Sequence, residues 1–154
     1  MAHIKEVAVA MSLIDKKDGT AYRILVAEDK EINQVMAVNL LKNLGCEVDL
    51  AKDGVQAVKM AKDVKYDLIF MDCEMPILDG YYATVQIREF ESSSQVIKKR
   101  TPIVALTAKV MSNDRKKCMD SGMNDYVAKP IIESAIVSVI NKWCAQVIDS
   151  RSDW

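Results

Sequence analysis

Histidine is nearly absent from this 154-residue chain: His3 is the only one, and it precedes every predicted strand. A Ser-His-Asp or Cys-His active site needs an imidazole base, so hydrolytic chemistry of that kind is excluded. The chain also lacks a G-x-x-x-x-G-K phosphate loop, which excludes the nucleotide site of P-loop enzymes. Any catalysis therefore rests on carboxylates and lysine.

Closely spaced cysteines, long apolar runs and excess charge are absent as well. The four cysteines include no C-x-x-C pair, so we predict free thiols in a reducing compartment and no zinc site. No apolar run could span a bilayer, and no signal peptide is recognisable. The 21 Lys and Arg residues nearly balance the 22 Asp and Glu residues, so no net field attracts nucleic acid or an anionic membrane. We expect a soluble, cytoplasmic protein.

Short apolar or β-branched runs alternate with helix-period segments from Arg23 onward. This alternation predicts βαβ units and a doubly wound parallel sheet. Most of the runs are continuously apolar, as strands are when both faces of a sheet are covered. The five predicted strands are Ile24–Ala27, Glu47–Ala51, Leu68–Met71, Ile103–Thr107 and Asp125–Ala128.

We expect one compact domain over residues 21–148, since a chain of this length that is 50% hydrophobic is too short for two ordinary cores. Residues 1–20 are predicted to be an extension or linker with helical spacing in part, and residues 149–154 a flexible tail.

The first predicted helix follows Asp29 and ends at Gly45, which suits the left-handed position past a helix end. A later helix is expected to be capped by Ser112 and to end at Gly122. In the first helix, apolar side chains recur at steps of three and four residues, which predicts a buried stripe. Its members are Ile32, Val35, Met36, Leu40 and Leu44.

Polar side chains follow four of the strands. Ligands of a doubly wound sheet bind at the carboxyl ends of its strands, where Glu28, Asp29, Asp72, Thr107 and Lys129 are all predicted to lie. Taken singly, each could be an ordinary polar residue at a strand end. Taken together, three acids, a hydroxyl and an amine indicate a common site.

Carboxylates held about 4 Å apart repel one another by about 4 kcal/mol at an effective dielectric constant of 20, so the cluster requires a cation. Ligands that are all oxygen favour Mg²⁺, with Ca²⁺ a weaker candidate. Beside such an ion, a carboxylate can attack a phosphoryl donor while an ammonium neutralises the transition state. Asp72 is the candidate nucleophile.

Four segments in chain order resemble the response-regulator receiver family. They are the strand ending in Glu28-Asp29, the D-x-x-M-P-x-x-D-G run of residues 72–80, the Thr101–Ala108 segment and the Gly122–Pro130 segment. The resemblance covers about residues 22–147, and four ordered motifs are far more specific than one. It is nearest to receivers fused to hybrid sensor histidine kinases.

The resemblance implies a flavodoxin-like (βα)5 fold with strand order 2-1-3-4-5. It also implies that Asp72 accepts a phosphoryl group, with Mg²⁺ and with Mn²⁺ as a substitute, from a histidine kinase or a histidine phosphotransfer protein of a phosphorelay. Such a domain is not a conventional enzyme: it catalyses its own phosphorylation and dephosphorylation. Its parent can be a larger, membrane-anchored histidine kinase. A monomer or weak dimer is expected.

The resemblance assigns metal binding to the carboxylates of Glu28, Asp29 and Asp72 and to the backbone carbonyl of Glu74. Lys129 is expected to pair with a phosphoryl oxygen. The bond between Lys129 and Pro130 is predicted to be cis, as is common in this family.

Two further residues are assigned to the response to phosphate. Thr107 is expected to hydrogen-bond the phosphoryl group, and Tyr126 to change rotamer as Thr107 moves; the alternative for Tyr126 is a half-buried strand aromatic. We also hypothesise that Glu74 and Lys109 form an ion pair across the pocket mouth that slows dephosphorylation. The alternative is two independent, solvated side chains.

Two other functions stay open on the sequence alone. A metal-dependent phosphohydrolase with an aspartyl nucleophile could use the same acids, although such enzymes usually have a second Asp where this chain has Glu74. A pseudo-receiver that only docks partners would keep the fold without phosphorylation. Docking is expected on the crevice face and the first helix if Ile32, Val35 and Met36 are partly uncovered; the alternative is that all three are core.

Overall fold

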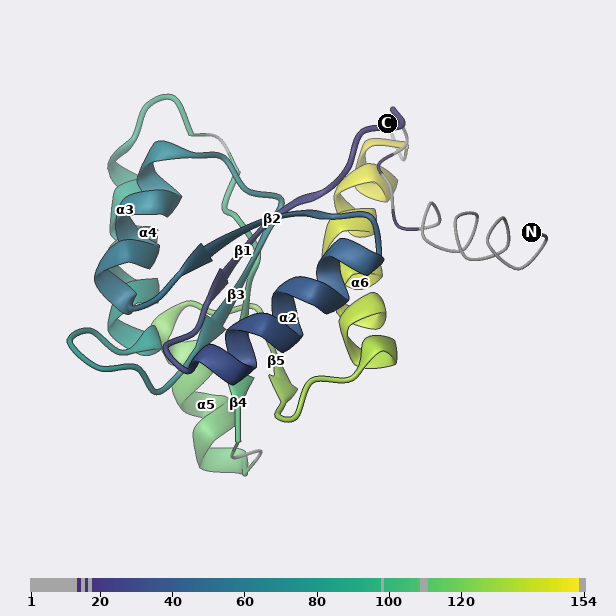
Figure 1. Cartoon of the computed structure of the whole chain (residues 1–154). Coiled ribbons are helices and arrows are strands. Elements are labelled where there is room, and N and C mark those ends of the chain that lie inside the picture. Colours follow the sequence, from purple (N-terminus) through teal and green to yellow (C-terminus); the bar gives the residue numbers. More distant parts are fainter. Residues whose placement is uncertain (1–13, 15, 17, 98, 109–110, 153–154) are drawn as a thin grey trace, which may run out of the picture.

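The computed structural model describes residues 14, 16, 18–97, 99–108 and 111–152, with side chains described as far as Cys144. Within these residues, five parallel strands form one sheet in the order β2-β1-β3-β4-β5 (Figure 1). The predicted strand order is confirmed, and so are the strands, apart from one residue added to two of them. The strands are β1 (Arg23–Ala27), β2 (Glu47–Ala51), β3 (Leu68–Asp72), β4 (Ile103–Thr107) and β5 (Asp125–Ala128).

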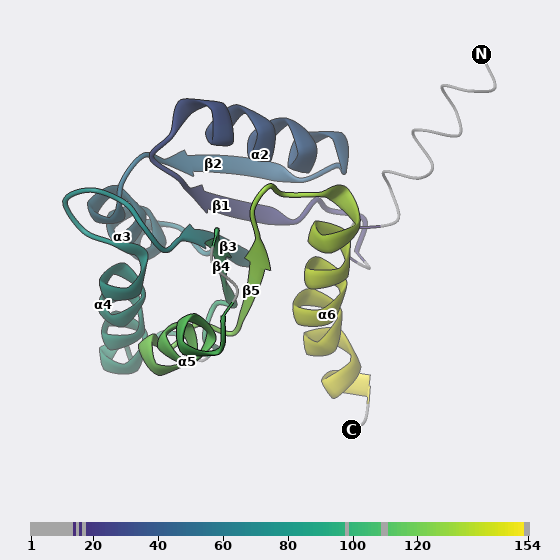
Figure 2. The same cartoon turned by 90° about the horizontal axis from the view of Figure 1, so that it is seen from below.

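Helices cover both faces of this sheet. Two of them, α2 (Glu31–Asn43) and α6 (Glu133–Ser152), pack on one face. The other face carries α3 (Gly54–Asp63), α4 (Gly80–Ser93) and α5 (Ser112–Ser121), as Figure 2 shows. Alternate strand residues enter the two cores, which explains why the strands are apolar without interruption.

The predicted division of the chain stays a prediction at both ends. Residues 1–13, 15 and 17 lie outside the described residues, and so does most of the proposed N-terminal helix. At the other end, α6 runs past residue 148 as far as Ser152. Among the described helices, none combines the length and apolarity that crossing a membrane requires.

The predicted stripe of α2 is wrong for three of its five members. Ile32, Val35 and Met36 are 71%, 52% and 44% exposed, whereas Ala37 and Leu41 are buried. Steps of three and four residues fit more than one rotational phase when apolar residues occur on both sides of a helix. The spacing therefore identified the helix without fixing which face packs on the sheet.

The predicted ends of the helices are mostly confirmed. Gly45 and Gly122 adopt positive φ angles of 92° and 105°, as expected past the ends of α2 and α5. Ser112 is not the cap of α5: the capping position is Met111, and no side chain caps the helix there.

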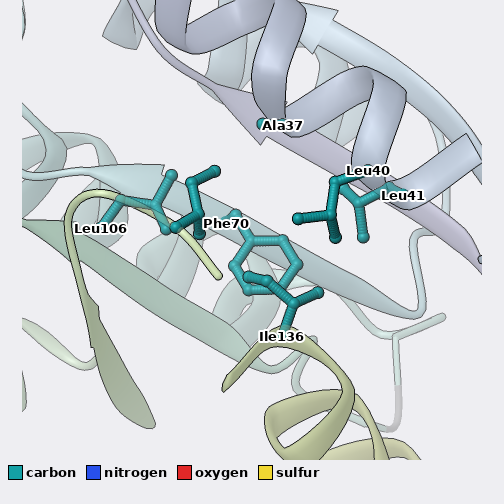
Figure 3. Close-up of a pocket in the computed structure, with 7 residues that line it drawn as sticks. Ala37, Leu40, Leu41, Phe70, Leu106 and Ile136 are labelled. Carbon is teal, nitrogen blue, oxygen red and sulfur yellow. The ribbon is translucent and has the colours of Figure 1, made fainter. Parts of the chain in front are cut away.

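A small apolar cavity of about 10 Å³ lies between α2, α6 and the sheet (Figure 3). It could hold about one water molecule, but a void lined by hydrocarbon stays dry. It is therefore a packing defect and not a ligand site. Its lining includes Ala37, Leu40, Leu41, Phe70, Leu106 and Ile136.

Gly80 ties the first residue of α4 to the end of β3. Its amide donates to the Cys73 carbonyl at 3.0 Å, and a Cβ at position 80 would collide with the backbone carbonyl of Asp72. A change from Gly to Ala inside a helix usually stabilises by about 1 kcal/mol. Here we expect Gly80→Ala to lower the free energy of unfolding by about 1–3 kcal/mol, because the collision must be relieved by moving backbone.

Urea unfolding followed by circular dichroism measures this effect. The control is Gln86→Ala, at an exposed position of the same helix. A Gly80→Ala midpoint at or above that of the wild type would contradict the close approach of the two backbones.

Candidate functional site

Three acidic side chains meet at the carboxyl edge of the sheet. Glu28 and Asp29 directly follow β1, and Asp72 is the last residue of the neighbouring strand β3. One carboxylate oxygen from each lies within 4.8 Å of the other two. Glu28 and Asp72 are only 1% and 3% exposed, so their mutual repulsion is poorly screened by solvent.

Lys129 supplies the positive charge of the cluster. Its Nζ lies 3.1 Å from Oδ2 of Asp72 and 3.2 Å from Oε2 of Glu28. The loop after β5 is held in place because the Lys129 amide donates to the carbonyl of Thr107 at 2.8 Å. The predicted cis bond between Lys129 and Pro130 is confirmed.

Burial and neighbouring charge perturb both members of the central pair. Burial, followed by the hydrogen bond and charge of Glu28, raises the pKa of Asp72 to about 6 against the opposing effect of Lys129. Burial lowers the pKa of Lys129, but the contacts with Asp72 and Glu28 outweigh it and the net pKa is raised. Three ionised acids and one ammonium leave a net charge of −2, which favours a divalent cation.

Asp29 provides an independent indication of a metal ion. Its Oδ1 atom is buried and accepts no hydrogen bond from any residue that the structure describes. A buried carboxylate oxygen without a partner is costly, and a bound cation would satisfy it. Because every side-chain donor is an oxygen, a hard ion such as Mg²⁺ fits the site.

The two residues predicted to respond to phosphate lie on neighbouring strands, β4 and β5. Thr107 ends β4 and is 7% exposed. Tyr126 is half-buried in β5, and the Arg115 guanidinium lies 4.8 Å from its ring centroid. The hydrogen bond of Thr107 to phosphate and the rotamer change of Tyr126 both stay predictions.

The structure describes only one member of the predicted ion pair between Glu74 and Lys109. The amide of Glu74 donates to Oδ1 of Asp72 at 3.2 Å, and the Glu74 side chain is exposed. Lys109 lies outside the described residues, so their ion pair across the pocket mouth stays a prediction.

Two residues of α2 that hold Glu28 were not predicted from the sequence. Asn33 Nδ2 donates to Glu28 Oε1 at 2.6 Å, and Gln34 Nε2 donates to the Glu28 backbone carbonyl at 2.8 Å. A signal was present, since both are polar residues in the first turn of a helix that follows the acidic pair. The predicted rotational phase of α2 would place Gln34 on the solvent side, whereas Asn33 lies at the margin of the predicted stripe.

Comparisons with known proteins agree with this geometry. The family model of the response regulator receiver domain matches residues 24–141. Hybrid signal transduction histidine kinase G of Dictyostelium discoideum is 42% identical over 135 residues, which are 85% of this chain. The match covers 4% of that protein, so the chain spans only a small part of this curated relative.

Two solved structures are similar over most of the chain. The receiver domain of sensor histidine kinase PA1611 from Pseudomonas aeruginosa, with a magnesium ion coordinated in its active site cleft, is 41% identical with a TM-score of 0.73; the match covers 82% of this chain and 99% of that one. The receiver domain of Saccharomyces cerevisiae Ssk1, crystallised with the histidine phosphotransfer protein Ypd1, is 36% identical with a TM-score of 0.76. That match covers 82% and 90% of the two chains.

The raised pKa of Asp72 predicts how stability depends on pH without metal. The native state binds the proton more tightly than an unfolded Asp with its ordinary pKa of 3.8, so this stabilisation is complete below that pH and is lost as pH rises through about 6. Between pH 4 and 7, the wild type should lose up to about 3 kcal/mol relative to Asp72→Asn, which has no carboxyl group to titrate.

Urea unfolding in EDTA over this pH range provides the measurement. Asp63→Asn, which changes an exposed acid in α3, should follow the wild type. Parallel curves for the wild type and Asp72→Asn would show that Asp72 titrates normally.

Proposed function

This chain belongs to the response regulator receiver family, and we propose that it accepts a phosphoryl group on Asp72 from a phosphohistidine. The observation that carries the proposal is the position of Lys129, whose Nζ contacts both Asp72 and Glu28 beside the buried, unpartnered oxygen of Asp29. Asp72, the Lys129 ammonium and the proposed position of the cation therefore lie next to one another.

The metal ligands in this proposal are the carboxylates of Glu28, Asp29 and Asp72 and the backbone carbonyl of Glu74. The magnesium-bound relative from Pseudomonas aeruginosa supports Mg²⁺ as the ion. A bound Mg²⁺ would supply positive charge to the phosphoryl oxygens and to the attacking carboxylate. Mn²⁺ has similar oxygen preferences and should substitute.

In the proposed transfer, a carboxylate oxygen of Asp72 attacks phosphorus in line with the bond to the imidazole nitrogen of the donor. The new O–P bond forms as the N–P bond breaks, and the nitrogen keeps the electron pair; the imidazole leaves neutral when its other ring nitrogen already carries a proton. Lys129 pairs with a phosphoryl oxygen, and the Thr107 hydroxyl donates to another. Loop arrangements that make these contacts best are then favoured, which shifts the population of conformers.

The position of Glu74 counts against a phosphohydrolase. An acid that protonates a leaving group must reach the reacting atoms, whereas the Glu74 side chain is exposed. A receiver should accept one phosphoryl group on Asp72 and then lose it slowly by hydrolysis.

The first test is phosphotransfer from a phosphorylated histidine phosphotransfer protein with Mg²⁺. The wild type should take up one phosphoryl group, and Asp72→Asn should take up none, since the nucleophile is gone. Asp63→Asn is the control for loss of an acid elsewhere. Phosphorylation of Asp72→Asn at the wild-type level would contradict the assignment.

Two further measurements test the alternative functions. Steady hydrolysis of small phosphate esters would favour a phosphohydrolase. Failure of the wild type to bind beryllofluoride with Mg²⁺ would favour a pseudo-receiver.

We further propose that the donor docks on the outer face of α2, defined by Ile32, Val35 and Met36. These three apolar side chains are exposed on the helix that begins two residues after Asp29. A donor histidine must come within bonding distance of Asp72, so its protein must cover the rim of the site. The Ypd1–Ssk1 complex supports a histidine phosphotransfer protein as the partner.

Replacing Val35 and Met36 together with Ala should raise the KM for the donor about 10-fold or more, because apolar contact area is lost at the interface. The rate at saturating donor should change little, since neither side chain contacts the reacting groups. Val96→Ala, at an 86% exposed position, is the matched control. An unchanged KM for the double variant would place the donor elsewhere.

A further inference from the structure

Glu28 is held at both ends by consecutive residues of α2. Asn33 Nδ2 donates to Oε1 of its side chain at 2.6 Å, and Gln34 Nε2 donates to its backbone carbonyl at 2.8 Å. An ionised carboxylate only accepts hydrogen bonds, so the amide nitrogen of Asn33 must face it. The 2.6 Å contact is the shortest that Glu28 makes among the described residues.

Lys129 is the other partner of the same carboxylate, and it is shared. Its Nζ lies 3.2 Å and 3.4 Å from the two Glu28 oxygens and 3.1 Å from Asp72. A lysine that turns toward a phosphoryl oxygen weakens its contact with Glu28. The amide of Asn33 takes no part in that exchange, so it can keep Glu28 oriented throughout.

We propose that Asn33 is a positioning residue that fixes the Glu28 carboxylate for capture of the divalent cation. This inference rests on the proposed function, since it concerns the same acidic cluster. Partners that orient a ligand from outside the coordination sphere typically change metal affinity by about 10- to 100-fold when they are removed. The fixed carboxylate also reduces the conformational entropy that ion binding must overcome.

The surroundings of Asn33 make a direct test possible. It is half-buried and lines a cavity of about 50 Å³ together with Glu28 and Lys129. Shortening the side chain therefore enlarges an existing space instead of opening one inside a dense core. Asn39 lies on the same helix, is exposed and makes no hydrogen bond that the structure records for its side chain, so Asn39→Ala serves as the matched control.

The experiment measures the Kd for Mg²⁺ by calorimetry on the unphosphorylated chain, without donor. Asn33→Ala and Asn33→Leu should both weaken binding about 10-fold, because neither carries a donor. Leu restores the lost volume, so it separates hydrogen bonding from packing. Asn39→Ala should bind like the wild type. Urea midpoints of the variants establish that each is folded at the assay temperature.

Mg²⁺ binding by either Asn33 variant at the wild-type Kd would overturn the positioning role. Phosphotransfer separates this role from docking: the Asn33 variants should recover the wild-type rate at saturating Mg²⁺ with the KM for the donor unchanged. A raised KM for the donor with an unchanged Kd for Mg²⁺ would instead assign Asn33 to the docking face. If the wild type itself binds no Mg²⁺ and takes no phosphoryl group, the proposed function fails, whatever the variants do.

Discussion

The contact of one ammonium with two buried carboxylates is the constraint on which the site depends. Glu28 and Asp72 are almost inaccessible to water, and Asp29 adds a third acid within 4.8 Å. Without positive charge, such a cluster would protonate or push its loops apart. Lys129 supplies part of that charge, while burial and Glu28 keep the pKa of Asp72 above its ordinary value. The remaining negative charge favours a divalent cation at the site.

The sheet order explains why these groups meet. Strands β1 and β3 are neighbours although α2, β2 and α3 separate them in sequence, so Glu28 and Asp29 lie beside Asp72. Lys129 comes from β5, two positions away, and reaches across because its loop is fixed to Thr107 at the end of β4. Asp72 lies within β3, whereas Glu28, Asp29 and Lys129 directly follow the ends of their strands. This arrangement allows Lys129 to change partners without any rearrangement of the sheet.

The strands and the acidic cluster were predictable from the sequence because they depend on local signals. A continuous apolar run marks a strand covered on both faces, and a polar residue immediately after it must lie at the sheet edge. The rotation of α2 was not predictable, since Ile32 and Ala37 both fit an apolar stripe and only packing against β1 and β2 selects between them. The contact of Gln34 with Glu28 was missed for the same reason. The cap of α5 at Met111 escaped prediction because no side-chain hydrogen bond marks it.

The orientation of α2 connects the proposed docking of the donor with the geometry of the acidic cluster. Its inner side holds both ends of Glu28 through Asn33 and Gln34, while its outer side presents Ile32, Val35 and Met36 to solvent. A protein that covers the outer face also restrains the helix turn that carries the two amides. The same short helix thus places the proposed docking surface and an anchor of the acidic cluster within one rigid element. Ordering of that turn by a partner would favour the carboxylate geometry that binds the cation, so binding of donor and cation should reinforce each other.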